Sequence, residues 1–316
     1  MRNASLREIR KYFLDKNLDE VITPLFVKSA GIEPYVDPLF FGEKYFLPTS
    51  PEISLKKTLA MQNEGCAGIY EIAHVFRDDA PDKTHLREFT MIEWYTKNYS
   101  CLNMMNDITD LLASLDHAGI DEKKDRNRFE SYAVFSVAEI FNIAYGVWPT
   151  SGWSFEDYFE VAKNHKIIHN PAAVVSKLHK EHLQMEVFSI LYDHAIQKYF
   201  KDRSELLFIK DYPPFLRGMA ELSNEGWAMR FEGYLSGLEI CSGYQEMSDS
   251  SELENVWNHN NEIRSFLGKK PHPVDLELIE VSRHMAGVAG MALGLERSLM
   301  ALHNIPDIQS FKLYRF

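Results

Sequence analysis

Cysteine is scarce in this chain of 316 residues: Cys66, Cys101 and Cys241 are its only three, and they are widely spaced. No CxxC pair occurs, which argues against a disulfide framework and for a reducing compartment. The sequence also lacks any apolar run near the roughly 20 residues of a membrane helix. Its N-terminus has no apolar core of a signal peptide. These absences predict a cytoplasmic protein with no membrane association.

Basic residues are outnumbered, with 34 Lys and Arg against 46 Asp and Glu and a formal net charge of −12. Nonspecific nucleic-acid binding requires basic groups that neutralise phosphates, so this balance disfavours it, although a local basic patch stays open. Hydrophobic residues make up 45% of the chain, which is ample for a large core. Without repeats, low-complexity tracts or a clear linker, residues 1–316 are predicted to form a single domain.

Hydrophobic periodicity places helices and strands along the chain. Helices are predicted over residues 5–16, 51–63, 101–119, 155–170, 185–200, 249–268 and 272–287. Strands are predicted over residues 21–26, 68–79, 88–99, 205–216 and 227–247, and a glycine-rich strand followed by a helix over 287–305. This order indicates an α+β domain with a helical insertion near residues 120–205.

The segment FTMIEWY (89–95) places Glu93 between Ile92 and Trp94, in what otherwise has the composition of a buried strand. A buried carboxylate is costly unless it is paired with a cation. We therefore predict that Glu93 binds a cation, either a ligand or a neighbouring Arg or Lys.

The hairpin formed by residues 68–99 carries a second set of polar side chains. Arg77 offers a planar fork suited to a phosphate. His85 can reach a second phosphate, and Phe89 can stack on a base. The alternative interpretation is an Arg–Asp surface hairpin without a ligand.

Two carboxylates, Glu239 and Glu246, lie seven residues apart in GLEICSGYQEM (237–247). A regular strand would direct them to opposite faces, and a turn or bulge at Ser242–Gly243 would bring them to one face. Beside a triphosphate they would imply Mg²⁺, which binds few protein oxygens together with phosphate oxygens. Two solvated glutamates are the alternative.

The segment GMALGLERSLM (290–300) combines two glycines with an arginine at the start of a helix. Gly290 and Gly294 allow a ligand to approach the backbone closely, and Arg297 opens a helix whose N-terminus favours anions. Close packing of a strand on a helix would explain the same glycines.

These stretches resemble the signature motifs of class II aminoacyl-tRNA synthetases, and within that class the lysine branch. KNLDEVITPLF, VFRDDAPDKTHLREFTMIEWY and GMALGLERSLM are similar to motifs 1, 2 and 3. TSPEISLKK and GLEICSGYQEMSD are similar to lysine-branch elements between them. The resemblance covers about residues 5–303. It implies an antiparallel sheet flanked by helices, and a homodimer built through motif 1.

Because motif 1 begins almost at Met1, we expect no anticodon-binding domain. The chain thereby resembles the freestanding members of the family, the elongation factor P–lysine ligases. These enzymes use ATP to activate a lysine-like amino acid and pass it to a lysine side chain of elongation factor P. The resemblance implies ATP and Mg²⁺ as cofactors, lysine or (R)-β-lysine as substrate, elongation factor P as acceptor, and no tRNA.

The resemblance also implies roles for individual residues. Catalysis falls to Arg77 and Arg297. ATP binding falls to Arg77, Asp78, Asp79, His85, Phe89, Glu239, Ile240, Gly294 and Arg297. The substrate contacts are Ser50, Pro51, Glu52, Glu93, Tyr95, Cys241, Ser242 and Glu246, with Glu93 as counterion of the distal ammonium. The implied Mg²⁺ ligands are Glu239 and Glu246.

Several positions depart from the family pattern. Asp78 replaces an asparagine, Asp79 shortens a glutamate, and Leu86 replaces an asparagine. Cys241 and Ser242 replace a small residue and an asparagine on the pocket wall. An inactive paralogue with a regulatory or interaction role therefore stays open as an alternative. So does an asparagine- or aspartate-branch ligase, which would need an arginine in place of the pocket glutamates.

Three other features have plainer interpretations. His165 and His169 are four apart on a predicted helix, and a solvated face is favoured over a metal pair. Met104 and Met105 are expected in the core or a dimer contact. Tyr212 belongs either to the pocket or to a packed turn.

Overall fold

The computed structural model describes residues 2–42, 44–117, 129–168, 177–201, 203 and 205–311. Its helices are α1 (Arg2–Asp15), α2 (Glu52–Ala60), α3 (Cys101–His117), α4 (Val137–Tyr145), α5 (Phe155–Asn164), α6 (Lys177–Tyr199), α7 (Ser250–Phe266), α8 (Leu276–Val281) and α9 (Leu295–His303). Its strands are β1 (Asp19–Glu20), β2 (Phe40–Phe41), β3 (Tyr45–Phe46), β4 (Gly68–Phe76), β5 (Glu88–Lys97), β6 (Tyr132–Ser136), β7 (Leu206–Tyr212), β8 (Ala228–Leu235), β9 (Leu238–Gln245) and β10 (Val288–Gly294).

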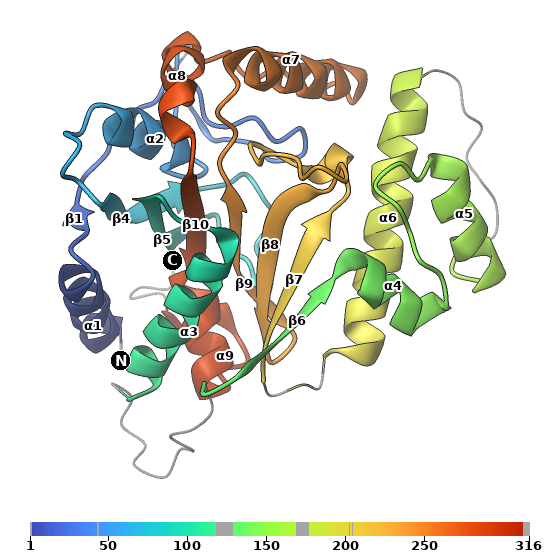
Figure 1. Cartoon of the computed structure of the whole chain (residues 1–316), viewed down its shortest axis with the longest axis horizontal. Helices are drawn as coiled ribbons and strands as arrows, with labels where there is room; N and C mark the ends of the chain where they lie inside the picture. The colour runs from blue at the N-terminus through green and yellow to red at the C-terminus, as the bar shows by residue number, and fades with distance from the viewer. Residues whose placement is uncertain are drawn as a thin grey trace.

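One eight-stranded sheet, in the order β1-β4-β5-β10-β9-β8-β7-β6, organises the chain (Figure 1). Its neighbouring strands are antiparallel except for the β1–β4 and β6–β7 pairs, which are parallel. The segments before and after the helical middle of the sequence thus meet at the β5–β10 contact. This confirms the predicted α+β fold with an antiparallel sheet flanked by helices.

Four helices begin where the sequence supplies a capping side chain. Ser136 and Ser154 each form a capping box with the acidic residue three positions later. Asp249 and Asp275 accept hydrogen bonds from the backbone N–H groups of α7 and α8. These local signals account for the starts of α4, α5, α7 and α8 independently of the tertiary packing.

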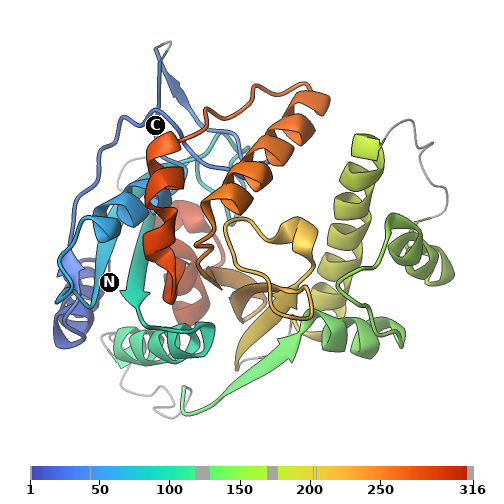
Figure 2. The same cartoon turned by 45° about the horizontal axis from the view of Figure 1, so that its top comes forward.

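Helices cover the sheet in three groups (Figures 1 and 2). Apolar side chains of α1, α3 and α9 share one core cluster with the central strands. Those of α4, α5 and α6 pack together with β7 and β8, at the far end of the sheet from α1. Helices α7 and α8 form a third cluster, which includes Ile53 of α2. Met104 and Met105 are buried in the first cluster, which confirms their core placement.

Three details of the predicted elements were wrong. Residues 21–26 form no strand, because Pro24 cannot donate to a ladder and Ile22 is 93% exposed; pairing stops at the short β1. The helix predicted over 272–287 is shorter and continues as a 3₁₀ turn, Ser282–Met285. The segment predicted as mainly helical also contains β6, which extends the sheet by pairing with β7.

A hydrogen-bonded group of tyrosines ties α6 to the sheet. The hydroxyl of Tyr192 lies 2.5 Å from that of Tyr212 and 3.2 Å from that of Tyr234. Tyr234 in turn donates to Glu232 Oε2 at 2.6 Å. Tyr212 is therefore part of a packed junction between the insertion and β8.

Two composition-based expectations can be compared with the fold. The three cysteines are all free thiols, as predicted. Among the described residues, no helix combines the length and apolar character needed to cross a membrane.

Candidate active site

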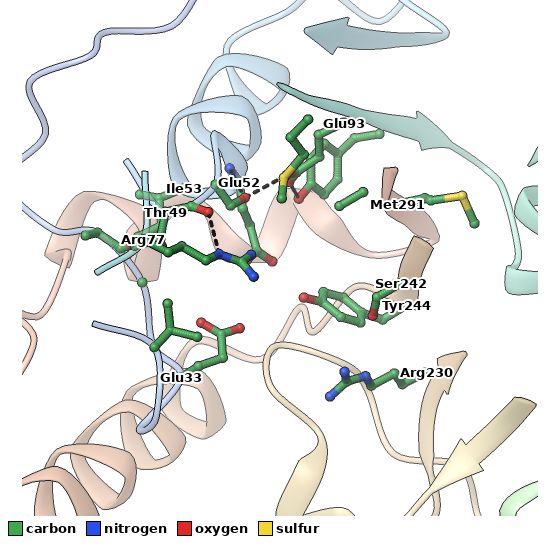
Figure 3. Close-up of a pocket in the computed structure, with 18 of the residues that line it drawn as sticks. Glu33, Thr49, Glu52, Ile53, Arg77, Glu93, Arg230, Ser242, Tyr244 and Met291 are labelled. Carbon is green, nitrogen blue, oxygen red and sulfur yellow. Dashed lines mark hydrogen bonds between the residues drawn. The ribbon is translucent and has the colours of Figure 1, made fainter. Parts of the chain in front are cut away.

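Two cavities adjoin on the sheet face that α2 covers. The carboxylate cavity, of about 200 Å³, is lined by Glu33, Glu52, Glu93 and Glu239 among others (Figure 3). The Phe89 cavity, of about 120 Å³, contains Phe89, His85 and Arg297. The two share a wall that consists of Arg77, Met91, Glu239, Ser242 and Ala292.

Strand pairing builds the floor of the carboxylate cavity. In one row across β5, β10, β9 and β8, the paired residues are Glu93, Ala292, Ser242 and Glu232. In the next row they are Tyr95, Gly290, Tyr244 and Arg230. A Cβ at Gly290 would collide with the Tyr95 ring, so glycine is needed for this close packing. Side chains from four strands thereby converge on one space.

Glu93 is buried and hydrogen-bonded from both sides. Its exposure is 2%; Oε2 accepts from Ser50 Oγ at 2.6 Å and Oε1 from Tyr95 Oη at 2.5 Å. Burial and then the charge of Glu52 raise its pKa to about 8, against the opposing effect of these hydrogen bonds. A cation entering the cavity would reverse this shift and favour the carboxylate.

Helix α2 brings a second carboxylate and an ammonium group into the same region. Glu52 lies in its first turn, and Lys56 Nζ lies 2.8 Å from Glu52 Oε1 and 2.5 Å from Glu246 Oε2. Burial opposes the charge of Lys56, but the two carboxylates outweigh it and raise its pKa. Burial also opposes the charge of Glu246 and thereby raises the pKa of that carboxyl to about 8. Lys56 is thus held as a cation between two carboxylates.

Arg230 and Glu33 line the carboxylate cavity although the sequence did not single them out (Figure 3). Arg230 donates to Glu232 Oε1 at 2.7 Å and to the carbonyl of Leu216 at 2.9 Å. Glu33 comes from an irregular segment that α7 holds in place, where Arg264 donates to the carbonyl of Pro34 at 3.0 Å. For Arg230 the sequence offered one signal, an arginine within a strand of alternating residues. For Glu33 the sequence offered no signal.

Two arginines, Arg77 and Arg297, line the Phe89 cavity. The Arg77 guanidinium lies 5.4 Å from the Phe89 ring centroid, and its Nε donates to the carbonyl of Thr49 at 3.3 Å. Arg297, in the first turn of α9, donates to the carbonyls of Thr84 and Glu239. His85 lies 2.9 Å from Asp82 and is partly exposed. Two guanidinium groups and an aromatic face therefore surround a half-open space.

Glu239 lies on the wall between the cavities because a bulge in β9 changes the direction of its side chain. The β8–β9 register shifts so that Ile240 is the extra residue, and the predicted bulge position at Ser242–Gly243 was wrong. Desolvation by the cavity walls, followed by the charge of Glu232, raises the Glu239 pKa to about 7. The carboxylate whose charge acts on Glu239 is therefore Glu232 of the adjacent strand, whereas Glu246 is ion-paired with Lys56.

Most of the predicted site residues lie at these cavities. The carboxylate cavity is lined by Ser50, Glu52, Glu93, Tyr95 and Ser242. The Phe89 cavity is lined by Asp79, His85, Phe89, Ile240, Cys241, Gly294 and Arg297. Three predicted residues line neither. Pro51 is buried as the N-cap of α2, Glu246 lies behind the cavity wall, and Asp78 is exposed beside Arg87.

Within the described ranges, no group of three or more His, Cys, Asp or Glu side chains is arranged to hold a metal ion. His165 ends α5 and packs against Tyr145. Its proposed companion His169 lies outside the described residues.

Comparison with known proteins agrees with the geometry. The model of the family described as tRNA synthetases class II (D, K and N) matches residues 1–315. A similar protein from Enterobacter sp. (strain 638), named elongation factor P–(R)-β-lysine ligase, is 27% identical, with 99% of this chain and 94% of that one covered.

Two further relatives carry the same name. The protein from Haemophilus ducreyi is 27% identical over 98% of this chain and 90% of its own. The protein from Yersinia pestis (strain Pestoides F) is 28% identical over 98% of this chain and 93% of its own. These findings confirm the family resemblance that the motifs predicted.

Proposed function

Because the chain belongs to the class II tRNA synthetases of the D, K and N type, we propose that it activates a lysine-like amino acid with ATP and transfers it to a lysine of elongation factor P. The substrate is a diamino acid such as lysine or (R)-β-lysine, and the intermediate is an aminoacyl-adenylate. The names of its relatives support the acceptor. The two adjoining cavities support the two-substrate first step.

The carboxylate cavity receives the amino acid. Glu93, held by Ser50 and Tyr95, pairs with the distal ammonium, and Glu52 pairs with the other amine. In a space with few waters such ion pairs select strongly for a diamino acid. The carboxylate of the substrate then points to Arg77, which lies on the shared wall.

The Phe89 cavity receives ATP. Phe89 and Arg297 enclose adenine, Arg77 grips the α-phosphate, and His85 contacts the outer phosphates. The substrate carboxylate attacks the α-phosphorus and pyrophosphate leaves. A neutral lysine amine of the acceptor then attacks the mixed anhydride and releases AMP. Catalysis by this chain consists of positioning and of cations that meet the developing charge.

A divalent cation fits the shared wall in part. Glu239 lies on this wall and is a donor suited to Mg²⁺ together with phosphate oxygens, whereas both oxygens of the neighbouring Glu232 are engaged by Arg230 and Tyr234. Glu246 fits less well, because Lys56 already occupies one of its oxygens. Bound there, Mg²⁺ would neutralise phosphate charge. We therefore favour Glu239, on the shared wall, as its protein ligand.

Assembly and location follow from the same proposal. We expect a homodimer, since apolar side chains of motif 1 are exposed, with Ile22 at 93%, Leu25 at 51% and Phe26 at 53%. We expect a protein acceptor and no tRNA, in line with the net charge of −12. The free thiols favour the cytoplasm.

The observation that carries the proposal is Glu93, a buried carboxylate beside a second cavity that is lined by two arginines and an aromatic ring. The test is ATP–pyrophosphate exchange with lysine, (R)-β-lysine, aspartate and asparagine, followed by mass spectrometry of elongation factor P. Exchange with a diamino acid and a mass gain on one acceptor lysine are expected. Exchange with aspartate would favour the other branch, and its absence with every amino acid would favour an inactive paralogue.

The aspartate-branch alternative draws support only from Arg230, which does reach the cavity. Its guanidinium is engaged by Glu232 and Leu216. Four glutamates line the same space, which suits amines and opposes a second substrate carboxylate.

A further inference from the structure

The carboxylate cavity is backed by an ammonium group of the protein itself, that of Lys56. The Lys56 side chain is 3% exposed, and Nζ bridges Glu52 and Glu246 at 2.8 and 2.5 Å. It also lies 5.7 Å from the ring centroids of both Tyr95 and Tyr244. This cation therefore contacts three residues that line the cavity: Glu52, Tyr95 and Tyr244.

We propose that Lys56 is a positioning residue that orients Glu52 and Glu246 and sets the charge of the cavity to match a substrate with two ammonium groups. The inference rests on the proposed function, because it concerns how the same cavity recognises its amino acid. Lys56 itself contacts carboxylates and needs no contact with the substrate.

The charges support this matching. Three buried glutamates, Glu52, Glu93 and Glu246, surround one buried ammonium, which leaves two negative charges uncompensated when all are ionised. Among the other charged residues that line the cavity, Glu33 and Arg230 have opposite charges, as do Glu239 and Arg77. A buried charge is tolerated only when it is paired. The two uncompensated negative charges therefore match the two ammonium groups of a diamino acid, whose carboxylate faces Arg77.

The contacts of Lys56 also leave one buried acceptor atom next to the cavity unpaired. Lys56 engages one oxygen of Glu246, while the other, Oε1, is buried and has no hydrogen-bond partner in the described structure. This oxygen lies against Gly290, whose backbone lines the cavity and where any Cβ would collide with it. Lys56 therefore leaves one buried carboxylate oxygen unpaired directly behind the wall of the cavity.

Without the ammonium group, Glu52 and Glu246 would be two buried carboxylates with no cation between them. Like charges at such distances cannot both ionise, so one would take a proton and turn toward the other. Glu52, which lines the cavity, would then present the wrong atoms to the substrate. The loss should appear in amino-acid binding and leave nucleotide binding intact.

The experiment compares Lys56→Met and Lys56→Gln with the control Lys57→Met in the full-length protein. Lys57 is the next residue of the same helix, and its ammonium pairs with Asp275 and Glu277 outside the cavity. Exchange kinetics give KM for the diamino acid, KM for ATP and kcat separately, and thermal unfolding reports folding. Exchange by the wild-type chain is measured first, since its absence with any diamino acid would refute the proposed function and not this inference alone.

Lys56→Met should raise KM for the diamino acid at least about tenfold, with KM for ATP within about twofold. Lys56→Gln, which keeps N–H donors without charge, should fall between it and the wild type. Lys57→Met should match the wild type. An unchanged amino-acid KM in either folded Lys56 variant would overturn the inference, as would equal rises in both KM values. If Lys56→Met does not fold, Lys56→Gln decides by the same criteria.

Discussion

The two cavities are built on opposite electrostatic plans. In the carboxylate cavity Glu52 and Glu93 are buried and accept hydrogen bonds, Glu93 from Ser50 and Tyr95 and Glu52 from Lys56. In the Phe89 cavity the cations remain partly exposed, and Arg77 and Arg297 are held mainly through backbone carbonyls. The first arrangement recognises a small cation through carboxyl groups that are held in place before the cation binds. The partly exposed arginines of the Phe89 cavity are suited to a larger anion that stays partly hydrated and keeps its counterions.

Arg77 lines both cavities, so its removal should have the largest effect on activity of the substitutions considered. Arg77→Ala is expected to lower the exchange rate about 100- to 1000-fold, since it removes a preorganised cation at the reacting phosphate. Steady-state exchange assays would measure kcat and both KM values. Arg10→Ala, which removes an exposed pair with Glu20, is the control. A loss confined to one KM would assign Arg77 to a single cavity.

Glu93→Gln should affect the carboxylate cavity alone. Removing one charge of a buried ion pair costs about 2 kcal/mol or more, so KM for the diamino acid should rise roughly 30-fold while KM for ATP is unchanged. Glu88→Gln is the matched control, because Glu88 lies on the same strand and is exposed beside His74. An equal effect of the two substitutions would contradict the assignment.

The pH dependence should separate the cavities further. The pKa of Glu93 is raised to about 8 in the free protein, so below that pH Glu93 must lose a proton to pair with the ammonium. KM for the diamino acid is therefore expected to rise as pH falls below 8, by up to about tenfold per unit. KM measured between pH 6 and 8 provides the test. A flat profile, or an equal slope in Glu93→Gln, would argue against it.

The smallest expected effect lies at the nucleotide. Phe89→Leu removes a ring that faces the Arg77 guanidinium at 5.4 Å. Such a contact at a partly exposed site contributes about 0.5–1 kcal/mol, so KM for ATP should rise about two- to fivefold. Phe89→Tyr should retain most of the affinity. A change in the amino-acid KM instead would show that the ring serves the other cavity.

Local patterns in the sequence determined much of this site. The alternation around Glu93 identified a buried carboxylate on a strand, and the glycines of β10 marked a close approach. The helices predicted to begin at residues 155 and 249 agree with α5 and α7, which Ser154 and Asp249 cap. The resemblance then supplied the order of the motifs, and the sheet brought β5, β9 and β10 side by side as that order required.

What sequence reasoning missed depends on contacts between distant segments. Arg230 reaches the cavity because β8 pairs with β9 opposite Tyr244, and the bulge at Ile240 turns Glu239 toward the site. Neither the register nor the bulge has a local signal. Lys56 and Glu52 are four apart on a helix, a visible pair, but their contact with Glu246 spans most of the chain. Irregular segments such as the one carrying Glu33 offered no periodicity at all.

The hydroxyl contact between α6 and the β8 tyrosine bears on how far the chain can be shortened. Tyr192 completes a chain of buried hydroxyls that ends on Glu232, beside the shared wall. Excising the insertion to obtain a minimal catalytic unit would strip a partner from Tyr212 and Tyr234 and bare the outer edge of the sheet. Engineers seeking a compact ligase scaffold should keep that helix and trim elsewhere.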